Sequence, residues 1–89
     1  MATGTIRKPF EIKKVTTEET TISGNSTAWI TIPSVSGYTR LGVVGYYIQG
    51  TGSSLITFYF VGATSLAARN TGSSQAKVTV DVDLLVVKN

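Results

Sequence analysis

The chain has 89 residues, a net charge of +3, and neither cysteine nor histidine. This length allows one domain at most. The missing residue types exclude disulfides, thiolate zinc sites, and catalysis by a Cys nucleophile or a His base. Small folds without disulfides or metals often gain stability by oligomerisation, so the composition favours a domain that assembles with copies of itself.

The composition is typical of an all-β protein. Val, Ile and Thr make up 31 of the 89 residues, and their β-branched side chains suit a pleated sheet better than a helix. Only 15% of the residues are charged, well below the usual quarter. So few charges on a small protein suggest that another molecule covers part of its surface.

The first elements are short and polar. Residues 1–9 are small, polar or basic and end in proline, which predicts a flexible N-terminal arm before a single domain over residues 10–89. A first strand is expected over 10–17, with a bulge near Lys13–Lys14, because Val15 is out of phase with the apolar residues before it. A polar turn and a second strand over 20–23 follow.

The segment 26–33 alternates cleanly between apolar and polar residues. Ala28, Ile30 and Ile32 would point one way and Trp29 the other, and Pro33 ends the strand because proline cannot donate to a ladder. Trp29 therefore has three readings that the sequence leaves open, which are burial in a subunit interface, burial in the core, and stacking against a ligand.

Two strongly apolar strands are expected next, over 40–49 and 54–62. They flank the turn Gly50-Thr51-Gly52-Ser53, which predicts a β-hairpin. In the second strand Ile56, Phe58 and Phe60 would line one face, and Leu55, Tyr59 and Val61 the other. A strand that is apolar on both faces needs cover on both, which two thin sheets from one short chain cannot supply. This is the main physical argument for an oligomer.

The last part of the chain contains a short strand over 64–69, a loop over 70–74 and a long strand over 75–88. In the long strand the residues from Val78 to Val86 at every second position would face inward, with Lys77, Asp81 and Asp83 outward. The chain is thus expected to form a small antiparallel β-sandwich, jelly-roll-like, with about six to seven strands and no helix.

Acidic side chains provide the only catalytic or metal-binding candidates. Asp81 and Asp83 would lie about 7 Å apart on one strand face, where a carboxylate pair could bind Ca²⁺ or flank a glycosidic bond. A solvated face kept soluble by charge is the favoured interpretation of this pair, and Glu18 and Glu19 are typical of a surface turn. We therefore predict no enzyme activity, no metal site and no cofactor.

Aromatic side chains and loops are the better candidates for binding. Tyr46 and Tyr47 would occupy opposite faces of one strand, and Tyr59 lies on the next. The loops over 34–39, 50–53 and 70–74 have the Ser, Thr, Asn and Gly content of recognition loops. The predicted ligand or interface residues are Trp29, Tyr46, Tyr47, Tyr59, Tyr38, Arg69 and Asn70.

Other partner classes are not expected. The basic residues are scattered and do not form the dense stripe with interleaved aromatics of a nucleic-acid footprint. The longest apolar runs are too short to insert through a bilayer, and the first residues lack the apolar stretch of a signal peptide.

A family resemblance extends over nearly the whole chain. It is carried by T-I-R-K-P-F at 5–10, I-P-S-V-S-G-Y at 32–38, G-V-V-G-Y at 42–46, R-N at 69–70 and the final V-x-V-x-V-x-L-L-V-V-K at 78–88. This pattern resembles small tail- or fibre-type virion proteins of bacteriophages and prophages, and the C-terminal heads of longer fibres.

The resemblance implies a β-sandwich head that is usually a homotrimer, contacts other virion proteins and takes part in attachment to host-surface glycans. It implies a virion location, with assembly in the bacterial host cytoplasm, and it brings no catalytic residues. A stand-alone carbohydrate-binding module that uses Trp29 is the alternative, and an inhibitor or effector domain is a third possibility.

Overall fold

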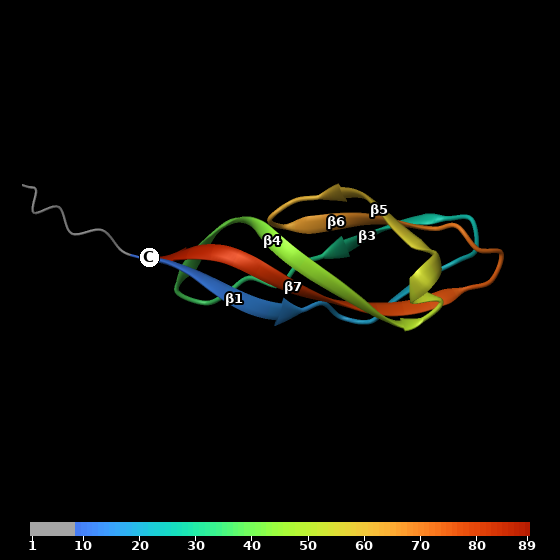
Figure 1. The fold of residues 1–89 in the computed structure, drawn as a ribbon, viewed down its shortest axis with the longest axis horizontal. Helices are drawn as coiled ribbons and strands as arrows, with labels where there is room; N and C mark the ends of the chain where they lie inside the picture. The colour runs from blue at the N-terminus through green and yellow to red at the C-terminus, as the bar shows by residue number, and fades with distance from the viewer. Residues whose placement is uncertain (1–8) are drawn as a thin grey trace, which may run out of the picture.

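The computed structural model describes residues 9–89 and consists of two antiparallel sheets (Figure 1). The long C-terminal strand with alternating apolar residues lies at the centre of the larger sheet. In the larger sheet the strand β7 pairs with β1 and β2 on one side and with β4 on the other. The smaller sheet has the order β3-β6-β5. The strands are β1 (Phe10–Thr16), β2 (Thr20–Ile22), β3 (Thr27–Thr31), β4 (Tyr38–Thr51), β5 (Ile56–Val61), β6 (Ser65–Asn70) and β7 (Ala76–Lys88).

The two sheets pack face to face around a purely aliphatic core. Alternation along β7 puts every second residue from Ala76 to Val86 inside, against residues of β2, β3 and β6 and the segment after β3. The buried core residues are Ile22, Ile30, Ile32, Leu66, Ala68, Ala76, Val78, Val80, Val82, Leu84 and Val86. The predicted all-β sandwich of about seven strands is therefore confirmed, and its single helical segment within residues 9–89 is the 3₁₀ helix η1 (Ser53–Leu55).

The predicted hairpin over residues 40–62 is wrong. Among the described strands β4 pairs only with β7 and β5 only with β6, so the connection through Gly50, Gly52 and η1 passes from one sheet to the other. Gly50 and Gly52 both have positive φ, 121° and 80°, which glycine adopts without strain. These glycines mark a crossover between the two sheets.

Strand irregularities also differ from expectation. β1 pairs with β7 in an unbroken register, so the bulge predicted near Lys13–Lys14 is absent: Phe10 and Ile12 face outward, while Val15 packs against the core. Register shifts occur instead in β4, between Arg40 and Gly42 and between Val43 and Gly45, and in β5, between Phe58 and Phe60. An extra residue at a bulge turns the following side chains relative to the sheet.

The strands run from Phe10 to Lys88, and the predicted N-terminal arm over 1–9 lies, except for Pro9, outside the described residues. No helix among residues 9–89 is long and apolar enough to cross a membrane.

Candidate functional site

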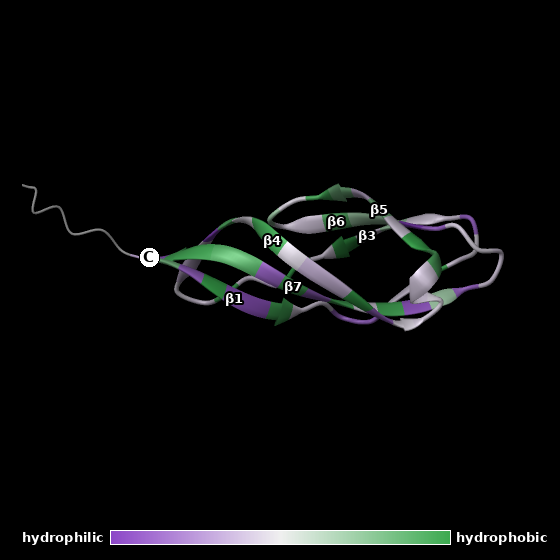
Figure 2. Cartoon of the chain, viewed as in Figure 1, coloured by the Kyte–Doolittle hydropathy of each residue, from purple (hydrophilic) through white to green (hydrophobic). Residues whose placement is uncertain are grey.

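One edge of the sandwich carries no charge beyond Arg40 near its start. β4 and β5 are edge strands of the two sheets, and a T-shaped contact between Tyr46 and Phe58, with ring centroids 4.8 Å apart, joins them. No charged residue occurs between Arg40 and Arg69. In Figure 2 the hydrophilic colour is accordingly prominent on β1 and nearly missing from β5.

Most of the exposed apolar surface lies along this edge. Eleven large apolar side chains are exposed within residues 9–89, and eight of them belong to β4, η1 and β5. We call these eight the uncharged flank: Leu41, Val44, Tyr46, Tyr47, Leu55, Tyr59, Phe60 and Val61.

The bulges of β4 help to expose the flank. Arg40 and Val43 lie opposite the buried residues Val86 and Leu84 of β7, which places them on the inner face of the strand. Leu41 and Val44 are the extra residues of the two register shifts and have no partner on β7. They are 47% and 55% exposed, because an extra residue at a bulge is left out of the ladder.

A second aromatic surface lies on the outer face of the smaller sheet. Trp29 of β3 and Phe60 of β5 both lie opposite Ala67 of the central strand β6. Their rings approach edge to face, with centroids 5.8 Å apart and an interplanar angle of 61°. Ala67 is only 5% exposed although it points away from the core, because the two rings lean together over it.

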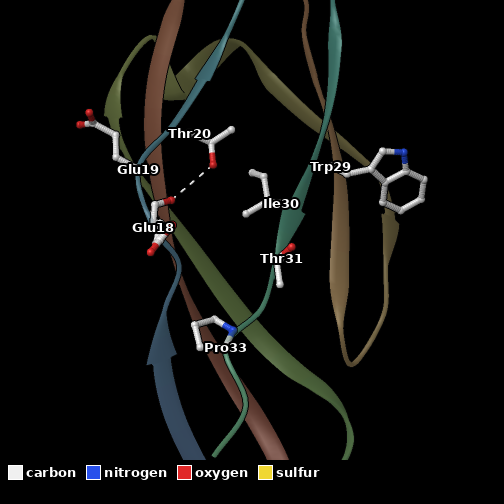
Figure 3. Close-up of a pocket in the computed structure, with 7 residues that line it drawn as sticks. All are labelled: Glu18, Glu19, Thr20, Trp29, Ile30, Thr31 and Pro33. Atoms are coloured by element: carbon white, nitrogen blue, oxygen red, sulfur yellow. Dashed lines mark hydrogen bonds between the residues drawn. The ribbon is translucent and has the colours of Figure 1, made fainter.

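The structure excludes one of the three interpretations of Trp29. Its side chain is 66% exposed, so burial in the core of its own chain is wrong. Trp29 also lines a hollow of about 460 Å³ at the opposite edge of the sandwich, together with Glu18, Glu19, Thr20, Ile30, Thr31 and Pro33. Figure 3 shows the indole pointing away from the two glutamates, so the hollow does not combine the ring with the carboxylates.

The other predicted candidates have separate environments. Tyr47 and Tyr59 are 68% and 65% exposed on the uncharged flank. Tyr38 begins β4 and is packed partly against the core, with the Lys13 ammonium 5.0 Å from its ring centre. Arg69 is half-buried in β6, opposite Thr27 on β3 and Thr57 on β5.

Asn70, predicted as a ligand or interface residue, is a structural residue instead. It is 1% exposed, and its Nδ2 donates to the carbonyls of Ile22, at 3.0 Å, and Ser74, at 2.7 Å. Its Oδ1 accepts a hydrogen bond from the Gly72 amide at 2.9 Å. With both ends of its amide used inside the chain, Asn70 ties β2 to the β6–β7 loop.

The two aspartates predicted as a pair on β7 have different surroundings. Asp81 accepts hydrogen bonds from Thr16 Oγ1 at 2.7 Å and from Gln49 Nε2 at 2.9 Å. Asp83 lies opposite Lys14 and Gly45 on the same outer face. Residues 9–89 contain no cluster of three or more acidic, His or Cys side chains that could hold a metal ion.

Sequence reasoning missed three contributors to these surfaces. Phe60 was placed on the same face as Ile56 and Phe58, but the β5 bulge turns it outward. Val44 and Ala67 are not among the residues that the sequence predicts as contributors to a binding surface. The uninterrupted absence of charge from residue 41 to 68 is the sequence signal that could have located the flank.

Comparison of the chain with protein-family models, curated proteins and solved structures gives no match.

Proposed function

We propose that this protein is a non-enzymatic module that assembles with copies of itself through the uncharged flank, as a structural or attachment component of a bacteriophage tail or fibre. The flank is the observation that carries the assembly part of the proposal. The virion part is supported by the resemblance of segments 5–10, 32–38, 42–46 and 78–88 to phage tail and fibre proteins.

The chemistry of the flank is that of a subunit interface. The centres of protein interfaces are depleted in charged residues and enriched in aromatic ones, and the flank combines four aromatic side chains with no charge. Half-exposed aromatic rings can each bury on the order of 100 Å² more. Eight large side chains together approach the roughly 800 Å² that each partner buries in a stable interface.

A second copy is the partner that the chain itself supports. A domain of this size buries only about 60–65% of its unfolded surface, and it has no disulfide to add stability. Closed rings of identical subunits hide the same patch on every copy. A homotrimer, as the family resemblance implies, would bury the flanks of all three copies around one axis, except for Phe60, whose ring lies beside Trp29 on the outer face of the smaller sheet.

The solution mass of the purified protein tests the proposal. The wild type is expected near three times 9.4 kDa, measured by light scattering or native mass spectrometry. Tyr47→Glu and Tyr59→Glu place a charge on the flank at side chains that are already exposed, so they should give folded monomers. Thr21→Glu, on an exposed β2 position away from the flank, should leave the trimer unchanged.

A stable wild-type monomer at high concentration would contradict the assembly proposal. An oligomer that survives both flank variants would show that copies meet elsewhere.

The alternative function, a stand-alone carbohydrate-binding module, is favoured by one observation. The exposed Trp29–Phe60 pair forms an aromatic platform on a sheet face, and aromatic rings of this kind can stack on sugars. A monomeric wild type that binds glycans and loses binding on Trp29→Ala would support this alternative over the trimeric module.

A further inference from the structure

The outer face of the smaller sheet is built in rows across its three strands. One row is Trp29, Ala67 and Phe60, and the next is Thr27, Arg69 and Thr57. Directly opposite residues of antiparallel strands point to the same side, and successive rows on one face are about 7 Å apart. The aromatic row and the row that contains Arg69 therefore lie side by side, with Thr27 and Thr57 exposed on either side of the arginine.

The β5 bulge creates the aromatic row. In an unbroken strand Phe60 would share the inner face with Phe58, but the register shift between them sets Phe60 opposite Ala67 on the outside. Because Ala67 has the smallest side chain that can fill this position, the two rings close over it to 5.8 Å. Bulges often redirect a side chain next to a binding site, and here the result is an aromatic platform.

Arg69 is the only charged residue on the three strands of this sheet. Within residues 9–89 no carboxylate lies within 4.0 Å of its guanidinium, and the one ion pair there joins Lys13 to Glu11. Nor does the guanidinium stack on a ring, since the single cation–π contact of the described residues is Lys13 over Tyr38. Among residues 9–89 the guanidinium, which carries five N–H donors, thus has neither an ionic nor an aromatic partner.

We infer that this face binds an acidic saccharide, with the sugar ring on the Trp29–Phe60 platform and its carboxylate on Arg69. The C–H groups of a pyranose pack on the negative face of an aromatic ring. A guanidinium recognises a carboxylate through two parallel hydrogen bonds. The hydroxyls of Thr27 and Thr57 can form hydrogen bonds with the hydroxyl groups of the sugar. The unpaired positive charge selects an acidic sugar over a neutral one, and the inference rests on the proposed attachment function.

The test uses the single tryptophan as its reporter. Full-length protein is titrated with uronic-acid and sialic-acid oligosaccharides, each paired with its carboxyl-reduced form, and Trp29 fluorescence and calorimetry report binding. At least one acidic oligosaccharide should bind at least about tenfold more tightly than its reduced form, which is the range of a charge-assisted hydrogen bond. Arg69→Gln should remove this preference, and Trp29→Ala, followed by calorimetry, should abolish binding.

Lys77→Gln is the matched control. It removes one positive charge from the outer face of the other sheet, where Lys77 is exposed on β7, and it should leave the acidic preference unchanged. Equal binding of the acidic and reduced oligosaccharides, or no binding of either, would overturn the inference. So would a preference that Lys77→Gln removes as fully as Arg69→Gln.

The solution mass of the same samples separates the two proposals. A wild-type trimer that does not bind acidic sugars would refute the saccharide inference but not the assembly proposal. A monomer that binds acidic sugars would refute the assembly proposal but not the saccharide inference. If Trp29→Ala converts a trimer to monomers, the face is a contact between copies and the saccharide inference is wrong.

Discussion

Asn70 shows how much a single side chain contributes to this small fold. Its side chain makes three hydrogen bonds, to Ile22 at the end of β2 and to Ser74 and Gly72 in the β6–β7 loop. The backbone amide of Asn70 also donates to the Ser26 carbonyl at 2.9 Å. Asn70 therefore helps to hold together the end of the sandwich where the β2–β3 and β6–β7 connections lie.

Asn70→Ala is expected to lower the free energy of unfolding by about 2–4 kcal/mol, because it removes the hydrogen bonds and leaves buried polar groups without partners. Gln75→Ala, an exposed position at the end of the same loop, should change it by less than about 0.5 kcal/mol. Urea denaturation followed by circular dichroism measures both. Equal effects of the two substitutions would show that the Asn70 network does not support the fold.

Single residues also show where sequence reasoning succeeds and where it fails. The exposure of Trp29 follows from its alternation with Ala28 and Ile30, which is a local signal. The burial of Asn70 has no local signal, because a polar residue before a Gly-Ser loop is normally exposed. Its main partner, the Ile22 carbonyl, comes from a strand far away in the sequence, and only the three-dimensional register brings them together.

At the scale of elements, β7 is the best predicted part of the chain. Its period of two over thirteen residues assigns one face to the core and the other to the outside, and the structure agrees residue by residue from Val78 to Val86. Long alternation is informative because a one-residue error would expose the entire apolar set.

Neighbouring leucines on β7 test this assignment. Leu84 is fully buried in the core, whereas Leu85 lies on the outer face opposite Ile12 and Gly42. Leu84→Ala should cost about 2–5 kcal/mol, the range for a buried leucine, and Leu85→Ala less than about 1 kcal/mol. Thermal or urea unfolding of the two variants under identical conditions provides the comparison. A Leu85→Ala variant as unstable as Leu84→Ala would mean that another subunit covers this outer face.

The hairpin predicted over residues 40–62 is wrong for a physical reason. A Gly-rich turn between two apolar strands is equally compatible with a hairpin inside one sheet and with a crossing between two sheets. The choice depends on which strands β4 and β5 pair with elsewhere, and those partners, β7 and β6, follow later in the chain. The bulges of β4 and β5 could not be predicted for a similar reason. Tertiary packing determines which residue of each strand is left out of the ladder.

At the scale of the whole molecule, the surface has two sides of different character. The elongated body (Figure 1) carries most of the charges of residues 9–89 on β1, the β1–β2 turn and β7, with Arg40 near the start of β4 and Arg69 on β6, while the part of the β4–β5 edge formed by residues 41–61 has none. The absence of charge on this edge could be read from the sequence. That the uncharged residues come together on one edge could not, because it depends on the pairing of the strands.

An interface without charge predicts how assembly responds to conditions. The proposed trimer should keep its mass between about 0.1 and 1 M NaCl, although the Debye length falls from about 10 to about 3 Å over this range. Because association stabilises the folded state by mass action, the melting temperature should rise as the protein concentration increases from about 1 to about 100 µM. Light scattering and differential scanning calorimetry measure the two effects.

A melting temperature independent of concentration would contradict assembly coupled to folding. Dissociation of the trimer by moderate salt would indicate that ion pairs, and not the uncharged flank, hold the subunits together.

Every ladder of the larger sheet includes β7, which pairs with β1, β2 and β4. While the ribosome is still making the preceding residues, these three strands have no neighbour to pair with in that sheet. The sandwich therefore closes only after β7 has emerged, and a chain that stops short of it exposes an aliphatic core to proteases. Copies that terminate before β7 are therefore expected to stay outside any assembly that the finished protein forms.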